Sequence, residues 1–213
     1  RPDRDSDKRP NIIVFITDDQ DKESIGAYGG KGMTPNLDRM TDEGMLFHSA
    51  FVTSTVCTPS RYSFLTGRYA GNAYDENYLQ ECPPEKQGSP QFNVELETDN
   101  MNIGAVMSQA GYMTGYTGKF HVGPSLKKVS DYEKYGLKYT AKDAEDSDST
   151  SEAFRVNERW YRKYLQQRGF KWAKNVYWQN MNKPYSRHNL EWTVSAALEF
   201  IESNKDRPFY LHF

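Results

Sequence analysis

The stretch that decides the fold is residues 12–19, IIVFITDD, in which a continuous apolar run ends in two aspartates. Such a run is typical of a strand buried on both faces, as in parallel sheets that helices cover. In these sheets a ligand binds beyond the carboxyl ends of the strands. Asp18 and Asp19 follow one such end, so we expect the functional site there.

Further strands and helices alternate along the chain. We predict strands over residues 12–17, 45–52, 112–117 and 209–213, and helices over residues 34–44, 59–65, 102–110, 151–167 and 188–203. Residues 70–98, rich in turn signals, predict a surface excursion, and the acidic, Ser-rich residues 142–151 predict a mobile loop. This order predicts an α/β fold with a mainly parallel, or mixed, central sheet sandwiched by helices.

A second informative stretch is residues 57–61, CTPSR, followed by LTGR at residues 65–68. A proline near the start favours a helix whose N-terminus holds Cys57, where free N–H groups attract negative charge. Arg61 lies one turn further and can reach back over Cys57.

A third stretch is residues 111–123, GYMTGYTGKFHVG, where Lys119 and His121 follow a predicted strand. Two positions apart on extended backbone, their side chains point to the same side. Strand ends and the helix start therefore bring the three stretches to one edge of the sheet.

These stretches resemble the sulfatase family, of the alkaline-phosphatase-like superfamily, through its Cys-x-Pro-Ser/Ala-Arg and Thr-Gly-Arg signature. The resemblance continues over residues 10–19, 34–38 with 44–47, and 111–123, so four blocks occur in the family's order. It implies that residues 11–213 form the N-terminal part of a larger catalytic domain, behind a polar tail over residues 1–10.

The resemblance implies a metal site made of Asp18, Asp19 and the modified Cys57. Adjacent carboxylates repel each other unless a cation lies between them, and their hard oxygens suit Ca²⁺ or Mg²⁺ rather than zinc. We expect one Ca²⁺, with Mg²⁺ as the less favoured occupant. About six oxygens are needed, and the family supplies a further Asp and Asn pair downstream.

The resemblance also implies the catalytic residues Cys57, Arg61, Lys119 and His121. A formylglycine-generating enzyme would oxidise Cys57 to formylglycine, whose hydrated aldehyde is the nucleophile of this family. Arg61 would hold its oxygen and offset charge near the metal. Lys119 would contact the sulfate oxygens, and His121 would hydrogen-bond the formylglycine hydroxyl.

Relatives in this family extend further than Phe213, with a downstream histidine, lysine and a smaller C-terminal domain. We therefore expect the remainder of the catalytic domain to be required for activity. The expected substrate is a sulfated carbohydrate or another small sulfate ester, hydrolysed at the sulfate.

Composition excludes several other classes of protein. Net charge is −2, with 27 basic and 29 acidic residues, which does not favour nucleic-acid binding. No apolar run approaches the ~20 residues of a membrane helix. Two cysteines cannot form a disulfide framework. The absence of an Asn-x-Ser/Thr sequon favours a periplasmic or secreted bacterial protein over a lysosomal one.

Two other functions remain open at this stage. A formylglycine-dependent phosphonate or phosphodiester hydrolase shares the fold, although Thr58 and Ser60 favour a sulfatase. An inactive homologue that binds sulfated glycans is the other alternative. Trp160, Trp172 and Trp178 are either core residues or a wall for stacking sugars.

Overall fold

The computed structural model describes residues 9–141, 144–180, 186 and 189–213. Most of the expected polar tail, the start of the expected loop at 142–151 and His188 thus lie outside the described residues. Four strands form one sheet in the order β1-β4-β2-β3, and every pairing is parallel. Their bounds are β1 Ile12–Val14, β2 Met113–Lys119, β3 Trp172–Tyr177 and β4 Phe209–His212.

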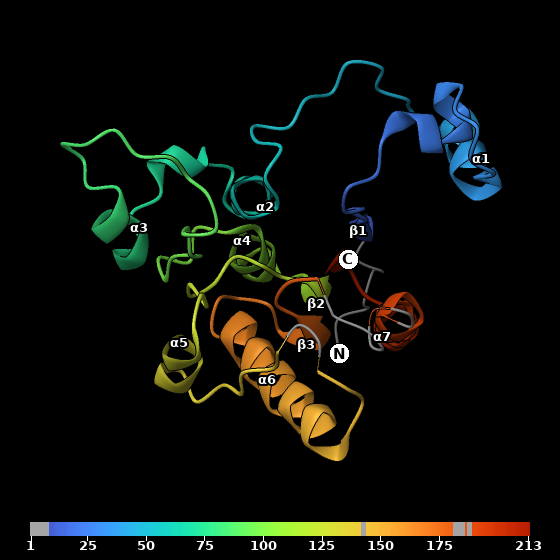
Figure 1. Ribbon diagram of the computed structural model, residues 1–213. Coiled ribbons are helices and arrows are strands. Elements are labelled where there is room, and N and C mark those ends of the chain that lie inside the picture. Colours follow the sequence, from blue (N-terminus) through green and yellow to red (C-terminus); the bar gives the residue numbers. More distant parts are fainter. Residues whose placement is uncertain (1–8, 142–143, 181–185, 187–188) are drawn as a thin grey trace, which may run out of the picture.

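Helices of the described chain surround this sheet (Figure 1). They are α1 Pro35–Glu43, α2 Cys57–Thr66, α3 Glu76–Glu81, α4 Ile103–Gln109, α5 Val129–Lys134, α6 Asp148–Gln166 and α7 Asn189–Asn204. Short 3₁₀ turns lie at Lys22–Ser24, Gly26–Tyr28 and Ala70–Asn72. Helix α1 stands away from the sheet, on long connections (Figure 1).

Strand β4 is the central apolar strand, and its side chains divide the core into two layers. Phe209 and Leu211 pack with α7 on one face, while Tyr210 belongs to the larger cluster on the other. That larger cluster includes residues of α2 and α6, so helices cover both faces of the sheet. This alternation is what a strand buried on both sides requires. The expected sandwich is confirmed.

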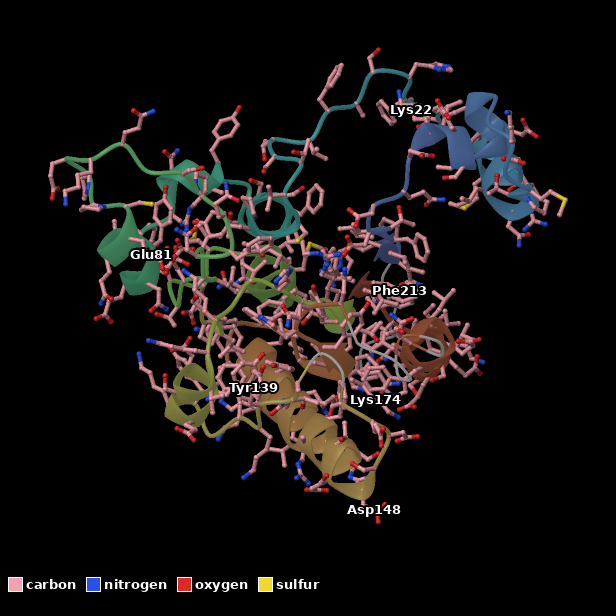
Figure 2. The ribbon with its side chains drawn as sticks, viewed as in Figure 1. Lys22, Glu81, Tyr139, Asp148, Lys174 and Phe213 are labelled. Atoms are coloured by element: carbon pink, nitrogen blue, oxygen red, sulfur yellow. The ribbon has the colours of Figure 1, made fainter. Side chains whose placement is uncertain are left out.

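Strand β1 is shorter and less buried than the sequence indicates. It pairs with β4 alone in the described sheet, and the Ile13 side chain is 49% exposed. The prediction of a strand buried on both faces is therefore wrong for residues 12–17. Beyond β1, Phe213 bonds to Val14 and Ile16 through its backbone, and Figure 2 shows it beside this strand. These bonds guide the chain toward Asp18.

The strand predicted over residues 45–52 is not formed. This segment is an exposed coil whose apolar side chains point outward, and no strand of the described chain pairs with it. A strand needs a neighbouring strand for its backbone hydrogen bonds, and an apolar pattern does not show whether such a neighbour exists. Helix α2 therefore follows a loop rather than a strand.

Further elements differ from expectation. Strand β3 and helix α5 were not predicted, and the expected loop at 142–151 becomes helix from Asp148, where Ser147 caps the first turn. The excursion at 70–98 is partly buried, because Val94 and Leu96 enter the core. Among the described residues, no helix combines the length and apolar character needed to cross a membrane.

His212, at the end of β4, lies fully inside the core and should make the fold sensitive to acid. Its ring stacks on Tyr116 at 4.7 Å between centroids. Burial, and then Arg61, lower the pKa of His212 from 6.5 to about 3. Between these pH values the unfolded state binds more protons, so stability is full above the unfolded pKa and falls as the pH drops toward 3.

We predict that His212→Phe flattens this acid dependence. The variant keeps an aromatic ring against Tyr116 but removes the titrating group, whose contribution reaches about 1.4 kcal/mol per pH unit. Urea unfolding of the full-length protein from pH 7 to pH 4 measures the difference. Replacing the exposed His48 by Asn is the control, and an equal slope in His212→Phe and wild type would contradict the prediction.

Candidate active site

Helix α2 carries the first two candidate residues. Cys57 is its first residue, Val56 precedes it in extended conformation, and Gly67 ends the helix with a left-handed φ of 70°. The predicted helix is confirmed, with a few more residues than expected. Arg61 lies one turn after Cys57 and is almost completely buried.

The other end of α2 is fixed by the carboxylate of Glu97. Tyr62 donates its hydroxyl to Glu97 at 2.6 Å, and Arg68 forms an ion pair with it at 3.4 Å. Arg68 also pairs with Asp99 at 2.6 Å. Because the Glu97 side chain is buried, these bonds hold α2 firmly against the segment before α4.

Cys57 faces His121 across the site. The Cys57 Sγ atom lies 3.3 Å from Nδ1 of His121. His121 follows β2 with a φ of 51°, a left-handed conformation that few residues other than glycine adopt. The chain turns sharply there, which is why His121 leaves the strand toward α2 instead of continuing along it.

Asp18 joins the three expected elements of the site. Its Oδ2 atom lies 2.6 Å from Nζ of Lys119 and 3.1 Å from Nη2 of Arg61. Arg61 also donates to the backbone carbonyl of Lys119 at 2.9 Å. The two cations held by Asp18 can stabilise an anionic group at this edge of the sheet.

The titration of these groups follows from their neighbours. Burial raises the pKa of Asp18, but Lys119 and then Arg61 outweigh it, so the pKa lies below its usual range. Burial, reinforced by Lys119 and Arg61, lowers the pKa of His121 to about 3. At neutral pH the site therefore holds an ionised Asp18 and a neutral imidazole at His121.

Asp19 lies at the same strand end but contacts none of these residues. It is exposed, and its φ of 56° turns the backbone after Asp18. Asp18 and Asp19 offer carboxylate oxygens, donors that suit a hard divalent cation. Within the described ranges, however, no three His, Cys, Asp or Glu side chains gather as a metal site. Asp18 and Asp19 can therefore serve as two of the ligands of a cation, but they do not form a complete site by themselves.

Several residues of the site were not predicted from the sequence. Asn180, beyond β3, accepts a hydrogen bond from Nζ of Lys119 at 2.8 Å. The buried Tyr116 donates to the same Lys119 carbonyl as Arg61 does. Phe92, from the excursion at 70–98, stacks on His121. An isolated Asn, Tyr or Phe carries no pattern, so no signal in one sequence would have identified them.

The sequence left the role of three tryptophans open, and in the structure each of them packs against other aromatic side chains. Trp160 stacks on Tyr164, and Trp172 packs against Phe200. Trp178 is buried and turns its edge toward His121, with 5.4 Å between ring centroids. Trp160 and Trp172 are half-buried and pack against the core clusters, so the core interpretation fits all three.

Comparison with known proteins adds independent findings. A family model described as Sulfatase matches residues 10–213. N-acetylgalactosamine-6-O-sulfatase of Bacteroides thetaiotaomicron is 34% identical over 128 residues, which cover 59% of this chain and 23% of that protein. N-acetylglucosamine-6-O-sulfatase of the same bacterium is 32% identical over 123 residues, covering 57% and 19%. The match thus spans about a fifth of these relatives' length.

A solved structure agrees with the fold. The crystal structure of yidJ from Bacteroides fragilis matches with a TM-score of 0.59 at 22% identity, over 95% of this chain and 43% of that chain. At this identity the likeness concerns the fold alone. It confirms the α/β architecture of alkaline-phosphatase-like type.

We predict that Asp18 stabilises the fold by pairing with Lys119 and Arg61. Asp18→Asn leaves two buried cations without a carboxylate and should cost about 1–3 kcal/mol, less than for a fully buried pair because the Asp18 side chain is 29% exposed. Adding Lys119→Met removes one unpaired cation, so the double variant should be more stable than the sum of the single effects predicts. Urea unfolding of the full-length protein in EDTA measures this cycle.

The exposed Asp42 of α1 provides the matched control. Asp42→Asn should change the free energy of unfolding by less than about 0.5 kcal/mol. Strict additivity of Asp18→Asn and Lys119→Met would show that the pair has no energetic coupling.

Proposed function

The chain belongs to the sulfatase family, and we propose that it supplies a large part of the active site of a sulfuric ester hydrolase. The observation that carries this proposal is the convergence of Cys57, His121 and the Asp18 ion pairs at one edge of the sheet. Two matched relatives are named for 6-O-sulfated amino sugars. We therefore propose a sulfated carbohydrate as the substrate.

The proposed nucleophile is residue 57, after a formylglycine-generating enzyme has oxidised Cys57. When present, the hydrated aldehyde would supply one hydroxyl that attacks sulfur and displaces the alcohol of the ester, and a second whose deprotonation re-forms the aldehyde and releases sulfate. The start of α2 suits this task because its free N–H groups stabilise negative charge. Cys57 is partly exposed, so a substrate can reach it.

His121 would hydrogen-bond the nucleophile, and Lys119 would stabilise the negative charge on the sulfate group. The imidazole of His121 is neutral at neutral pH, so Nδ1 can accept a hydrogen bond from a hydroxyl of residue 57 at this distance. Lys119 would contact the sulfate oxygens, because its ammonium is already directed to the site by Asp18 and Asn180. Its charge then stabilises the negative charge that develops during transfer.

Arg61 would act on the carboxylate of Asp18 and, after oxidation, on the oxygen of residue 57. Its guanidinium contacts Asp18 and the Lys119 carbonyl, which supports the expected role of offsetting charge near the metal. Its expected bond to the residue 57 oxygen has no counterpart among the contacts of the Cys57 thiol. We propose that this contact forms with the oxidised residue.

Asp18, Asp19 and residue 57 would hold one Ca²⁺, with Mg²⁺ the less favoured ion. Such a cation lowers the pKa of a bound hydroxyl and offsets negative charge on sulfate. The two aspartates offer carboxylate oxygens, which are donors of the hard type that calcium prefers. The remaining oxygens would come from parts of the protein outside the described residues. We also propose a periplasmic or secreted location.

Our first functional prediction concerns Cys57. Cys57→Ala should abolish hydrolysis of 4-nitrophenyl sulfate, because the nucleophile is lost, while the melting temperature stays near that of wild type. Cys57→Ser should accumulate a sulfate ester on the protein, since serine has no second hydroxyl to expel sulfate. Mass spectrometry of the tryptic peptide with residue 57 reports both the aldehyde and the trapped ester.

The outcomes separate the competing functions. Residual wild-type turnover in Cys57→Ala would exclude residue 57 as nucleophile. An unmodified thiol together with binding of sulfated glycans would favour an inactive binding homologue. Faster cleavage of bis-4-nitrophenyl phosphate than of the sulfate would favour the phosphodiesterase alternative.

The second functional prediction concerns the metal and uses Asp19. Unlike Asp18, Asp19 pairs with no described Lys or Arg, so Asp19→Asn should leave the calcium-free protein unchanged. It should weaken Ca²⁺ binding at least about tenfold, which removes about 1.4 kcal/mol of calcium-dependent stabilisation. Melting temperatures in EDTA and in excess Ca²⁺ measure this, with Asp42→Asn as control. A calcium-induced shift equal to that of wild type would exclude Asp19 as a ligand.

A further inference from the structure

His121 is oriented by rings rather than by a second hydrogen bond. A functional histidine usually donates its other ring nitrogen to a carboxylate or carbonyl, which fixes the ring rotation. Here Nδ1 faces Cys57, while Nε2 bonds to no residue in the part of the chain that the structure describes. Something else must hold the imidazole in this rotation.

Two aromatic side chains enclose the imidazole. The Phe92 ring stacks on it, with centroids 5.3 Å apart and planes inclined by 29°. Trp178 contacts it edge to face, with centroids 5.4 Å apart and planes at 82°. His121 is only 7% exposed, so these rings leave its imidazole little freedom to rotate. Aromatic pairs in such geometries contribute favourable energy beyond area burial.

Phe92 is itself held in place by its neighbours along the chain. The backbone N–H of Gln91 donates to Oδ1 of Asn93, and Nδ2 of Asn93 donates to Glu81. Four residues after Phe92, the N–H of Leu96 donates to the carbonyl of Val122, next to His121. The segment that carries Phe92 is thus tied to the segment that carries His121.

We propose that Phe92 is a positioning residue for the reaction proposed above, acting through His121. Its ring fixes the rotation of the imidazole so that Nδ1 faces residue 57. Trp178 closes the other side, but it also packs on Phe120 and Tyr161 in the core. Phe92 is 50% exposed, so its replacement removes the stack with little loss of core packing.

The test compares Phe92→Ala, Phe92→Leu and Phe92→Tyr in the full-length protein with 4-nitrophenyl sulfate. We expect kcat to fall at least about tenfold in Phe92→Ala with KM nearly unchanged, since small misplacements of a reacting group cost this much or more. Phe92→Tyr should restore kcat, because it keeps the stacked ring. Phe92→Leu should lie between the two.

A crystal structure of Phe92→Ala gives a readout that does not depend on turnover. The imidazole of His121 should rotate, placing Nδ1 beyond about 3.5 Å from residue 57, outside hydrogen-bond distance. An inactive wild type would count against the proposed function, while the ring orientation would still decide the role of Phe92. An unrotated imidazole would overturn the proposal.

Phe64→Ala is the matched control, because Phe64 is exposed to 43% on α2 and makes no ring contact with His121. It should leave kcat unchanged. A rise in KM with normal kcat in Phe92→Ala would make Phe92 a substrate-binding surface instead. A loss of activity that follows a lowered melting temperature, without rescue by Phe92→Tyr, would assign it a purely structural role.

Discussion

The carboxylate of Asp18 is the constraint on which the site depends. It lies beyond β1 and pairs with Arg61 from α2 and Lys119 from β2, so one side chain connects three separate elements. Removing two cations from water is costly unless a counter-charge compensates them. The position of Asp18 therefore follows from electrostatics as much as from hydrogen bonding within the sheet. A bound cation would add to this arrangement a third positive neighbour for the same carboxylate.

Sequence patterns predicted an element correctly where the local pattern of the segment agrees with its place in the fold. Residues 209–213 were expected as a buried strand and β4 forms there over Phe209–His212, and the CTPSR stretch starts a helix at Cys57. The approach of Asp18, Arg61, Lys119 and His121 also followed from two strand ends and the start of one helix. The pattern could not tell an edge strand from a central one, because burial of Ile13 depends on which strands pair with it. The apolar residues 45–52 failed as a strand for the same reason.

The site residues whose role could not be predicted from the sequence have a physical property in common. Asn180 and Phe92 approach the site from loops, where position depends on tertiary contacts and not on periodicity. The unusual backbone of Asp19 and His121 was also invisible, because asparagine or glycine is the usual residue at positive φ. Such conformations cost free energy and persist where surrounding contacts impose them. Both flank the same edge of the sheet, where the ligand is expected.

The strand order has a consequence for how the protein is made. Strand β4 lies between β1 and β2, and the side chain of Asn11 accepts a bond from the Phe209 backbone across 198 positions. During synthesis, β1 emerges from the ribosome long before the strand that it pairs with. Until β4 is made, the apolar residues of β1 have no strand to pair with. Pairing is also slow afterwards, because it closes a very long loop. During this period the unpaired edge and the apolar side chains of β1 are exposed, which favours aggregation.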